Sequence, residues 1–525
     1  MRTRVLFTVA TALAIAAPLS AQGRGGAANP GSQTPGGGGG RAGGNNSAGV
    51  IAVDHISETQ HTTTIGGKTI AYTAHAGTLV LKGPDGKARA SMFFVAYTKD
   101  GEDPSKRPLT FFYNGGPGAA TIWLHMGMMG PKRVQLGPEG FQTAPPYHLV
   151  DNEDSPLDVT DLVSVDAMMT GFSRPAEGVE TSQFTGAQQD ITNMGEFVRT
   201  YLTRYNRWTS PKYLFGESYG TFRSAGLASE LQNNQGIELN GVMLLGTVLD
   251  FGMLTQSPMN DIGYANFLPT YTATAYFHHK LPADLQGGDE KKAIDESRTF
   301  AYGEYLTALA RGNRLTAAEQ TAIATKLARF TGLSTQFILN SNLRVSADPF
   351  RVELLRDKRE TVGRLDSRLL GMNADAASTR EEYDPSEIAP TAAYLSTFLD
   401  YLHTDLKWDS ELQYYTGGHT GRWDYSNFEN RYASTAEQLR ATMARNPFLK
   451  VMVASGWYDM ATPFANAEYT FAHMGFDQTY LDRVKFTYYP SGHMVYANPN
   501  ALKMIKHDVA DFIDGTKATG ASMKP

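Results

Sequence analysis

The sequence contains no cysteine, so no disulfide can brace the fold and stability must come from the buried core. It also lacks an excess of basic residues, because 47 Lys and Arg stand against 53 Asp and Glu, for a net charge of −6. No basic cluster is interleaved with aromatic residues, so nucleic acid is not an expected partner. No H-E-x-x-H or comparable set of metal ligands is present, and we expect neither a metal nor another cofactor.

Long apolar runs are absent after the first few residues, so no stable membrane span is expected in the mature chain. The N-terminus reads MRTRVLFTVATALAIAAPLSAQ, with two arginines, an apolar run and small residues that end at Ala21. This layout predicts a secretory signal peptide over residues 1–21 and an exported protein, periplasmic or secreted. The alternative, a membrane anchor, needs a longer apolar run. No cysteine is available to carry a lipid at the cleavage site.

Composition and periodicity divide the rest of the chain. Residues 22–50 are rich in glycine and poor in apolar side chains, which predicts a disordered linker. Residues 51–254 and 396–520 alternate strand-like and helix-like pieces, a pattern that favours a mostly parallel central sheet flanked by helices. Residues 255–395 carry helical patterns such as LTAAEQTAIATKLARFTG, while strand signals fade. The sequence thus predicts an α/β domain interrupted by a helical insertion.

The segment GESYG, residues 216–220, has the spacing G-x-S-x-G. A strand-like YLF precedes it and a helical pattern follows it, which is the context in which a sharp turn exposes a nucleophilic serine. Ser218 is therefore the candidate nucleophile. The alternative is an ordinary loop serine, because a chain with 52 glycines can produce this spacing by chance.

A serine nucleophile needs a base, and the base needs an orienting acid. Asp459 in VMVASGWYDMATPF and His493 in FTYYPSGHMVY follow Ser218 in the chain order that α/β-hydrolases use. Each comes shortly after a predicted strand. Competing residues of the same types lie in glycine-rich, helix-like or polar stretches: His419, His473, His507 and Asp482.

Acyl transfer also needs two backbone N–H donors for the oxyanion. One is expected from Tyr219, directly after the nucleophile, and the other from a loop after an earlier strand. The segment NGGPG, residues 114–118, lies in that place, and Gly115 and Gly116 can adopt backbone angles that other residues avoid. The alternative is a plain turn, which glycine and proline also favour.

Five segments, taken in order, resemble the serine carboxypeptidase family, peptidase family S10. FFYNGGPGAATIWLHMGMMGP looks like its W-x-N-G-G-P-G segment, and GESYG like its G-E-S-Y turn. VDAMMTGFSR is similar to its D-x-P-x-G-T-G-F-S segment, and GWYDMATP and SGHMVY to its aspartate and histidine segments. The resemblance implies an α/β-hydrolase fold with residues 255–395 as the cap. It also implies a serine-type carboxypeptidase that releases C-terminal residues from peptides.

Residue by residue, the resemblance implies Ser218, Asp459 and His493 as the triad, and the N–H groups of Gly116 and Tyr219 as the oxyanion hole. It implies further that Asn114 and Glu217 bind the terminal carboxylate of a peptide substrate. A carboxyl group in a poorly solvated pocket has a raised pKa, and in its protonated form it donates a hydrogen bond to an anion. The alternatives for Glu217 are a solvent-facing position or an ion pair with an arginine.

The chain departs from the family pattern at several positions, and these departures bear on pocket shape and substrate preference. They are Phe112 for tryptophan, Met128 for a second recognition glutamate, Ala119 and Ala120 for cysteine or serine, and Ala167, Met168 and Met169 for proline and glycine. Two other functions remain open on the sequence. One is an esterase or acyltransferase of the same fold, and the other is a catalytically inert binding protein.

Overall fold

The structure is a computed structural model that describes residues 49–140 and 143–516. The predicted signal peptide at 1–21 and nearly all of the predicted linker at 22–50 lie outside the described residues. Within those residues, no helix has both the length and the apolar character that a membrane crossing requires.

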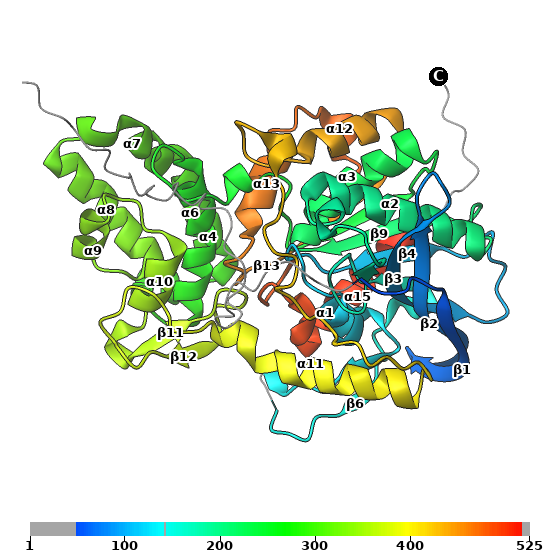
Figure 1. The fold of residues 1–525 in the computed structure, drawn as a ribbon. Coiled ribbons are helices and arrows are strands. Elements are labelled where there is room, and N and C mark those ends of the chain that lie inside the picture. Colours follow the sequence, from blue (N-terminus) through cyan, green and yellow to red (C-terminus); the bar gives the residue numbers. More distant parts are fainter. Residues whose placement is uncertain (1–48, 141–142, 517–525) are drawn as a thin grey trace, which may run out of the picture.

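Among the described residues, one ten-stranded sheet organises the larger part of the molecule (Figure 1). Six strands run parallel in the order β7-β4-β9-β10-β13-β14, and β3, β2 and β1 extend the sheet beyond β7 as antiparallel strands. The strands are β1 (His55–Ile65), β2 (Lys68–Lys82), β3 (Ala88–Lys99), β4 (Leu109–Tyr113), β7 (Asp161–Val165), β8 (Arg174–Pro175), β9 (Lys212–Glu217), β10 (Gly241–Leu245), β13 (Lys450–Gly456) and β14 (Val484–Tyr489). Because neighbouring parallel strands need crossover connections, helices must cover both faces.

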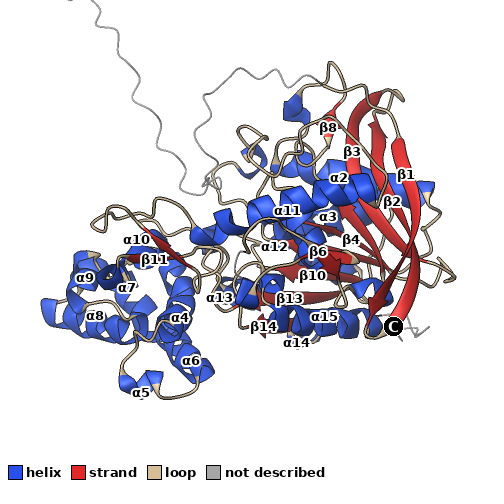
Figure 2. Ribbon diagram, turned by 90° about the horizontal axis from the view of Figure 1, so that it is seen from below, coloured by secondary structure: helices blue, strands red, loops and turns tan. Residues whose placement is uncertain are grey.

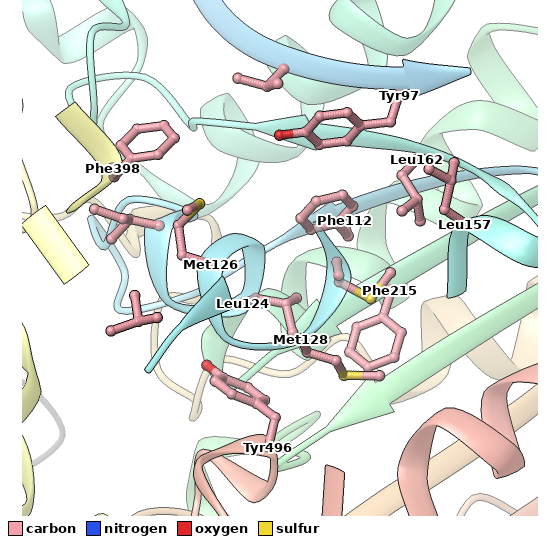
Figure 3. Close-up of a cluster of buried hydrophobic side chains, with 14 of the residues drawn as sticks. Tyr97, Phe112, Leu124, Met126, Met128, Leu157, Leu162, Phe215, Phe398 and Tyr496 are labelled. Carbon is pink, nitrogen blue, oxygen red and sulfur yellow. The ribbon is translucent and has the colours of Figure 1, made fainter. Parts of the chain in front are cut away.

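The central strands are buried on both faces, which explains their near-continuous apolar sequence. Successive side chains alternate: Phe111 packs beneath α2 (Ala187–Arg204), α3 (Tyr219–Asn234) and α12 (Ala436–Arg445). Phe112 faces the opposite layer of α1 (Ile122–Leu124), α11 (Pro385–Thr404) and α15 (Pro499–Asp514), part of which is drawn in Figure 3. The predicted mostly parallel sheet flanked by helices is confirmed.

The remaining described strands and α-helices are shorter or lie between β10 and β13. They are β5 (Lys132–Val134), β6 (Leu149–Asp151), α4 (Ile262–Phe277), α5 (Ala283–Gln286), α6 (Glu290–Phe300), α7 (Leu306–Arg311), α8 (Ala317–Thr331), α9 (Thr335–Asn340), α10 (Ala347–Glu353), β11 (Glu360–Val362), β12 (Leu370–Met372), α13 (Phe464–Ala472) and α14 (Gln478–Leu481).

The segment from α4 to β12 forms a mostly helical lobe beside the sheet domain (Figures 1 and 2). Local sequence sets its helices: α8 begins with a capping box of Thr316 and Glu319 and ends at Gly332, whose φ is 72°. The lobe has a buried cluster of its own, in which the rings of Tyr271 and Phe350 stack at 4.0 Å. The limits 255–395 stay a prediction, and α11 spans the second of them with Tyr394 and Phe398 in the main core.

Stability of the lobe is expected to depend on this stacked pair. Phe350→Ala removes a fully buried ring and should lower the free energy of unfolding by about 3–5 kcal/mol, because a cavity remains. Chemical denaturation followed by circular dichroism measures the loss. Phe448→Ala is the control, since Phe448 is 57% exposed and its removal should cost less than about 0.5 kcal/mol. Equal losses in the two variants would contradict the interpretation.

Candidate active site

Ser218 lies on a sharp turn between β9 and α3, with φ 61° and ψ −129°. A non-glycine residue rarely takes a positive φ, and such strain gathers at functional turns. The turn is tight enough that a Cβ on Gly216 would lie 2.2 Å from the carbonyl oxygen of Gly220. The Ser218 N–H donates to the Leu245 carbonyl at 2.8 Å, which ties the turn to the neighbouring strand β10. The strand-turn-helix context predicted for GESYG is therefore present.

Asp459 and His493 form a buried pair at the same edge of the sheet, with 2.7 Å between Asp459 Oδ2 and His493 Nδ1. Asp459 Oδ1 accepts hydrogen bonds from the N–H groups of Ala461 and Thr462, at 2.8 and 2.9 Å. The Thr462 hydroxyl donates to Oδ2 at 2.6 Å. Each carboxylate oxygen is thus hydrogen-bonded although the group is buried.

These contacts set the charges of the pair. Burial opposes ionisation of Asp459, but the charge of His493 and the hydrogen bonds from His493 and Thr462 outweigh it, so the pKa of Asp459 lies below its ordinary value. For His493, burial favours the neutral ring. The charge of Asp459 and its hydrogen bond outweigh that effect, Glu217 adds to them, and the pKa of His493 is raised. The acid is held ionised and the imidazole is made a stronger base.

The end of β10 connects the pair to the serine. Leu245 accepts the Ser218 N–H, and a Cβ on the next residue, Gly246, would lie 2.8 Å from Cε1 of His493. Ser218 is half-buried, and its hydroxyl makes no hydrogen bond to any described group. Catalytic hydrogen bonds are often long before substrate binds, so we expect the bond between the Ser218 hydroxyl and His493 Nε2 to form in the complex.

The competing histidines and the competing aspartate interact with residues other than the candidate triad. His419 stacks on Tyr415 and His473 on Tyr469, with ring centroids 3.6 and 3.8 Å apart. His507 pairs with Asp511 on the surface, and Asp482 accepts a hydrogen bond from Gln478. In the described part of the chain, none of these four residues forms a hydrogen bond with Ser218.

The NGGPG loop follows β4 and passes directly against the start of α3. A Cβ on Gly115 would lie 2.4 Å from the backbone nitrogen of Tyr219, and Gly116 has φ 103°, so both positions require glycine. As the first residue of α3, Tyr219 has no intrahelical acceptor for its N–H. Neither this N–H nor that of Gly116 donates to an acceptor in the described ranges. Two adjacent donors are therefore available to an anionic oxygen.

A buried ion pair that the sequence did not reveal supports this loop. Arg223 on α3 is fully buried and pairs with Asp190 on α2 at 2.7 Å. Its Nη1 donates to the Asn114 carbonyl at 2.7 Å, which fixes the start of the loop. The only available signal was an arginine among the apolar residues of the helix after GESYG.

Glu217, the last residue of β9, is 2% exposed. The Tyr496 hydroxyl donates to its Oε2 at 2.8 Å. Burial raises the pKa of Glu217 to about 7, Asp459 adds to the rise, and the charge of His493 and side-chain hydrogen bonds from Tyr496 and Asn114 oppose it. Asn114 is held in turn, because its Oδ1 accepts the Leu124 N–H at 2.8 Å. The solvent-facing alternative is excluded, and no arginine of the described ranges pairs with Glu217.

Two departures from the family pattern have clear positions. Met128 is fully buried and lies in the same apolar cluster as Tyr496 (Figure 3). Met169 has φ 64°, a left-handed conformation that costs a side chain about 1–2 kcal/mol relative to the usual regions. The sequence indicated a change in this loop, and the structure adds that Met169 occupies the conformation for which glycine is suited. Nothing in the sequence linked Tyr496 to Glu217.

The hydrogen bond from Tyr496 should hold down the pKa of Glu217. In Tyr496→Phe the carboxylate loses a donor, so we expect the pKa to rise above about 7. Infrared titration of the carboxyl band, assigned by its loss in Glu217→Gln, measures the shift. Tyr394→Phe is the control, because this buried hydroxyl makes no hydrogen bond to Glu217 among the described contacts and should leave the titration unchanged. A pKa that falls or stays constant in Tyr496→Phe would refute the expectation.

Comparison with known proteins identifies the family of the chain. The sequence profile of the serine carboxypeptidase family matches residues 68–488. No curated protein sequence matches the chain. Similar solved structures include proline iminopeptidase from Mycobacterium smegmatis, with 14% identity, a TM-score of 0.34 and coverage of 85% of this chain and 100% of that chain. Another is a soluble variant of monoglyceride lipase from Saccharomyces cerevisiae, with 12% identity, a TM-score of 0.35 and coverage of 84% and 95%. Because the family profile spans most of its length, this chain belongs to the serine carboxypeptidase family and has an α/β-hydrolase fold.

Proposed function

We propose that this hydrolase is an exported serine-type carboxypeptidase that releases C-terminal residues from peptides through a Ser218-His493-Asp459 triad and an acyl-enzyme. The observation that carries the proposal is the buried Asp459–His493 pair, 2.7 Å apart, at the sheet edge where Ser218 stands on its strained turn. Export is supported by the layout of residues 1–21.

The chemistry follows from the positions of these groups. The Ser218 oxygen attacks the last peptide carbonyl while His493 Nε2 accepts the serine proton. The N–H groups of Gly116 and Tyr219 donate to the oxyanion. His493 then gives the proton to the departing amine, which leaves an acyl-enzyme. Water attacks this ester, with His493 again as base, and Ser218 is regenerated.

Recognition of the substrate's free carboxylate is assigned to Asn114 and Glu217. A protonated Glu217 donates a hydrogen bond to a carboxylate, whereas an ionised Glu217 repels it. Its pKa of about 7 makes the protonated form dominant in acid and increasingly scarce above neutrality. A carboxyl group directly before the nucleophile therefore suits a substrate that brings its own negative charge.

Covalent labelling tests whether Ser218 is the nucleophile, and it also tests the alternative that the protein is a catalytically inert binding protein. A fluorophosphonate should label the wild-type protein at Ser218, and Ser218→Ala should abolish labelling because it removes the serine hydroxyl of the GESYG turn. Ser229→Ala, a half-buried serine later in the same helix, should be labelled like the wild type. Absence of labelling in the wild-type protein, or persistence in Ser218→Ala, would overturn the triad.

Peptides with free and amidated C-termini test the substrate class and separate a carboxypeptidase from an esterase or acyltransferase. We expect kcat/KM for the free peptide to be at least about 100-fold higher at pH 5, since a lost charged hydrogen bond and an unpaired buried group each cost about 1–3 kcal/mol. The preference should decline as the pH rises through about 7, where Glu217 ionises.

Glu217→Gln cannot ionise and should lose this decline. Glu230→Gln, a buried glutamate of α3, should keep the wild-type profile. Equal cleavage of the two peptides, or an unchanged profile in Glu217→Gln, would count against carboxylate recognition.

A further inference from the structure

One segment of the helical lobe reaches the catalytic loops. Residues 363–368, between β11 and β12, are called the cap strap here. The Ser367 N–H donates to the Tyr458 carbonyl, and the Met460 N–H donates to the Arg364 carbonyl, both at 3.0 Å. These bonds attach the strap to the residues on either side of Asp459.

The same strap holds the histidine loop. The His493 N–H donates to the Leu365 carbonyl at 2.6 Å. Contact at the preceding residue is so close that a Cβ on Gly492 would lie 2.4 Å from that carbonyl oxygen and 2.5 Å from Cβ of Asp366. The strap therefore contacts both catalytic loops. It bonds to the Asp459 loop at Tyr458 and Met460, and to the histidine loop at the backbone of His493.

Arg368 adds a side-chain link. It is 7% exposed and binds Asp366 in a bidentate pair, at 3.0 Å from Nε and 2.6 Å from Nη2. Its Nη1 also donates to the Pro490 carbonyl at 3.1 Å, and its Nη2 lies 3.4 Å from the Ser491 hydroxyl. One planar guanidinium thus joins the strap to the loop that carries His493.

The strap is itself fixed to the lobe and to α11. The hydroxyl groups of Ser367 and Thr274 lie 2.6 Å apart, and His278 Nε2 lies 2.7 Å from the Ser367 carbonyl oxygen, so α4 holds it on one side. The Ser386 hydroxyl at the start of α11 accepts the Leu365 N–H at 2.9 Å. Movement of the strap would require these bonds to break together.

The loops need such support because strand pairing stops before them. The register between β13 and β14 ends at Gly456 and Tyr489, three and four residues before Asp459 and His493. Direct bonds from Trp457 to Tyr489 and from Tyr458 to Ser491 carry the pairing a little further. Beyond them, the strap forms backbone hydrogen bonds with both loops near the catalytic pair.

We propose that the cap strap positions Asp459 and His493 for proton transfer, with Arg368 as its positioning residue. This inference rests on the proposed triad and assigns the lobe a part in the chemical step, in addition to any contact with substrate. Small displacements of a catalytic group have large effects, since a shift of about 1 Å can cost about 100-fold in rate.

Arg368→Lys tests the proposal, because lysine keeps the charge but cannot make the bidentate pair. We expect kcat to fall by about 10- to 100-fold with KM changed less than about threefold. Labelling by a fluorophosphonate without a peptide portion should slow by a similar factor. Arg344→Lys is the matched control: Arg344 makes the same bidentate pair with Asp261 and donates to the Leu309 carbonyl, yet it lies within the lobe. It should leave kcat within about twofold of the wild type.

Two further measurements keep the test decisive. Gly492→Ala pushes the strap from the histidine loop without touching Arg368, and it should lower kcat as well. The proton NMR signal of the His493 Nδ1–H, hydrogen-bonded to Asp459, should shift or vanish in Arg368→Lys and persist in Arg344→Lys. This readout holds even if the wild-type protein is not labelled, an outcome that would refute the triad separately. Wild-type kcat and NMR signal in a folded Arg368→Lys, or a raised KM with unchanged kcat, would overturn the positioning role.

Discussion

The buried pair of Asp459 and His493 is the interaction on which the rest of the site depends. Removal of two charges from water is costly, and a buried pair persists only where further hydrogen bonds satisfy the remaining oxygens. Here Asp459 accepts hydrogen bonds from the N–H groups of Ala461 and Thr462 and from the Thr462 hydroxyl, which fulfils that requirement. Those donors lie on a loop beyond the end of β13, so the loop must be held as firmly as the strands. The order of the sheet and the placement of the lobe both serve that need.

The pKa values of two carboxyl groups at this edge shift in opposite directions despite similar burial. Asp459 has donors on both oxygens and a cationic partner, and its pKa is depressed. Glu217 has a phenol and an amide beside it, fewer donors against the same desolvation, and its pKa rises to about 7. Divergent environments of this kind let one site keep a permanent anion and a neutral hydrogen-bond donor at the same pH. The charge of His493 and the hydrogen-bond donors, more than the depth of burial, account for the difference between the two pKa values.

The sequence predicted the fold class well because its signals are local. Apolar runs marked the central strands, glycines marked the turn at Ser218, and the helical pattern of the middle third marked the lobe. It also indicated the three residues that the sheet brings to one edge, since chain order and position after strands are readable. It could not indicate Tyr496 beside Glu217, Arg223 beneath Asn114, or the strap. The contacts of these residues with the site join positions 91 to 279 residues apart, and neither periodicity nor propensity records which distant segments meet.

The lobe's separate hydrophobic cluster has a consequence for how such an enzyme diversifies. Helices α7, α8 and α9 pack within the lobe's own core and can accept new side chains with local repacking. The six residues of the cap strap have no such freedom, since the strap is hydrogen-bonded to two loops outside the lobe. Natural variation is therefore expected to gather in the outer helices. The cap strap between β11 and β12 should accept fewer substitutions, because a change there would disturb both loops.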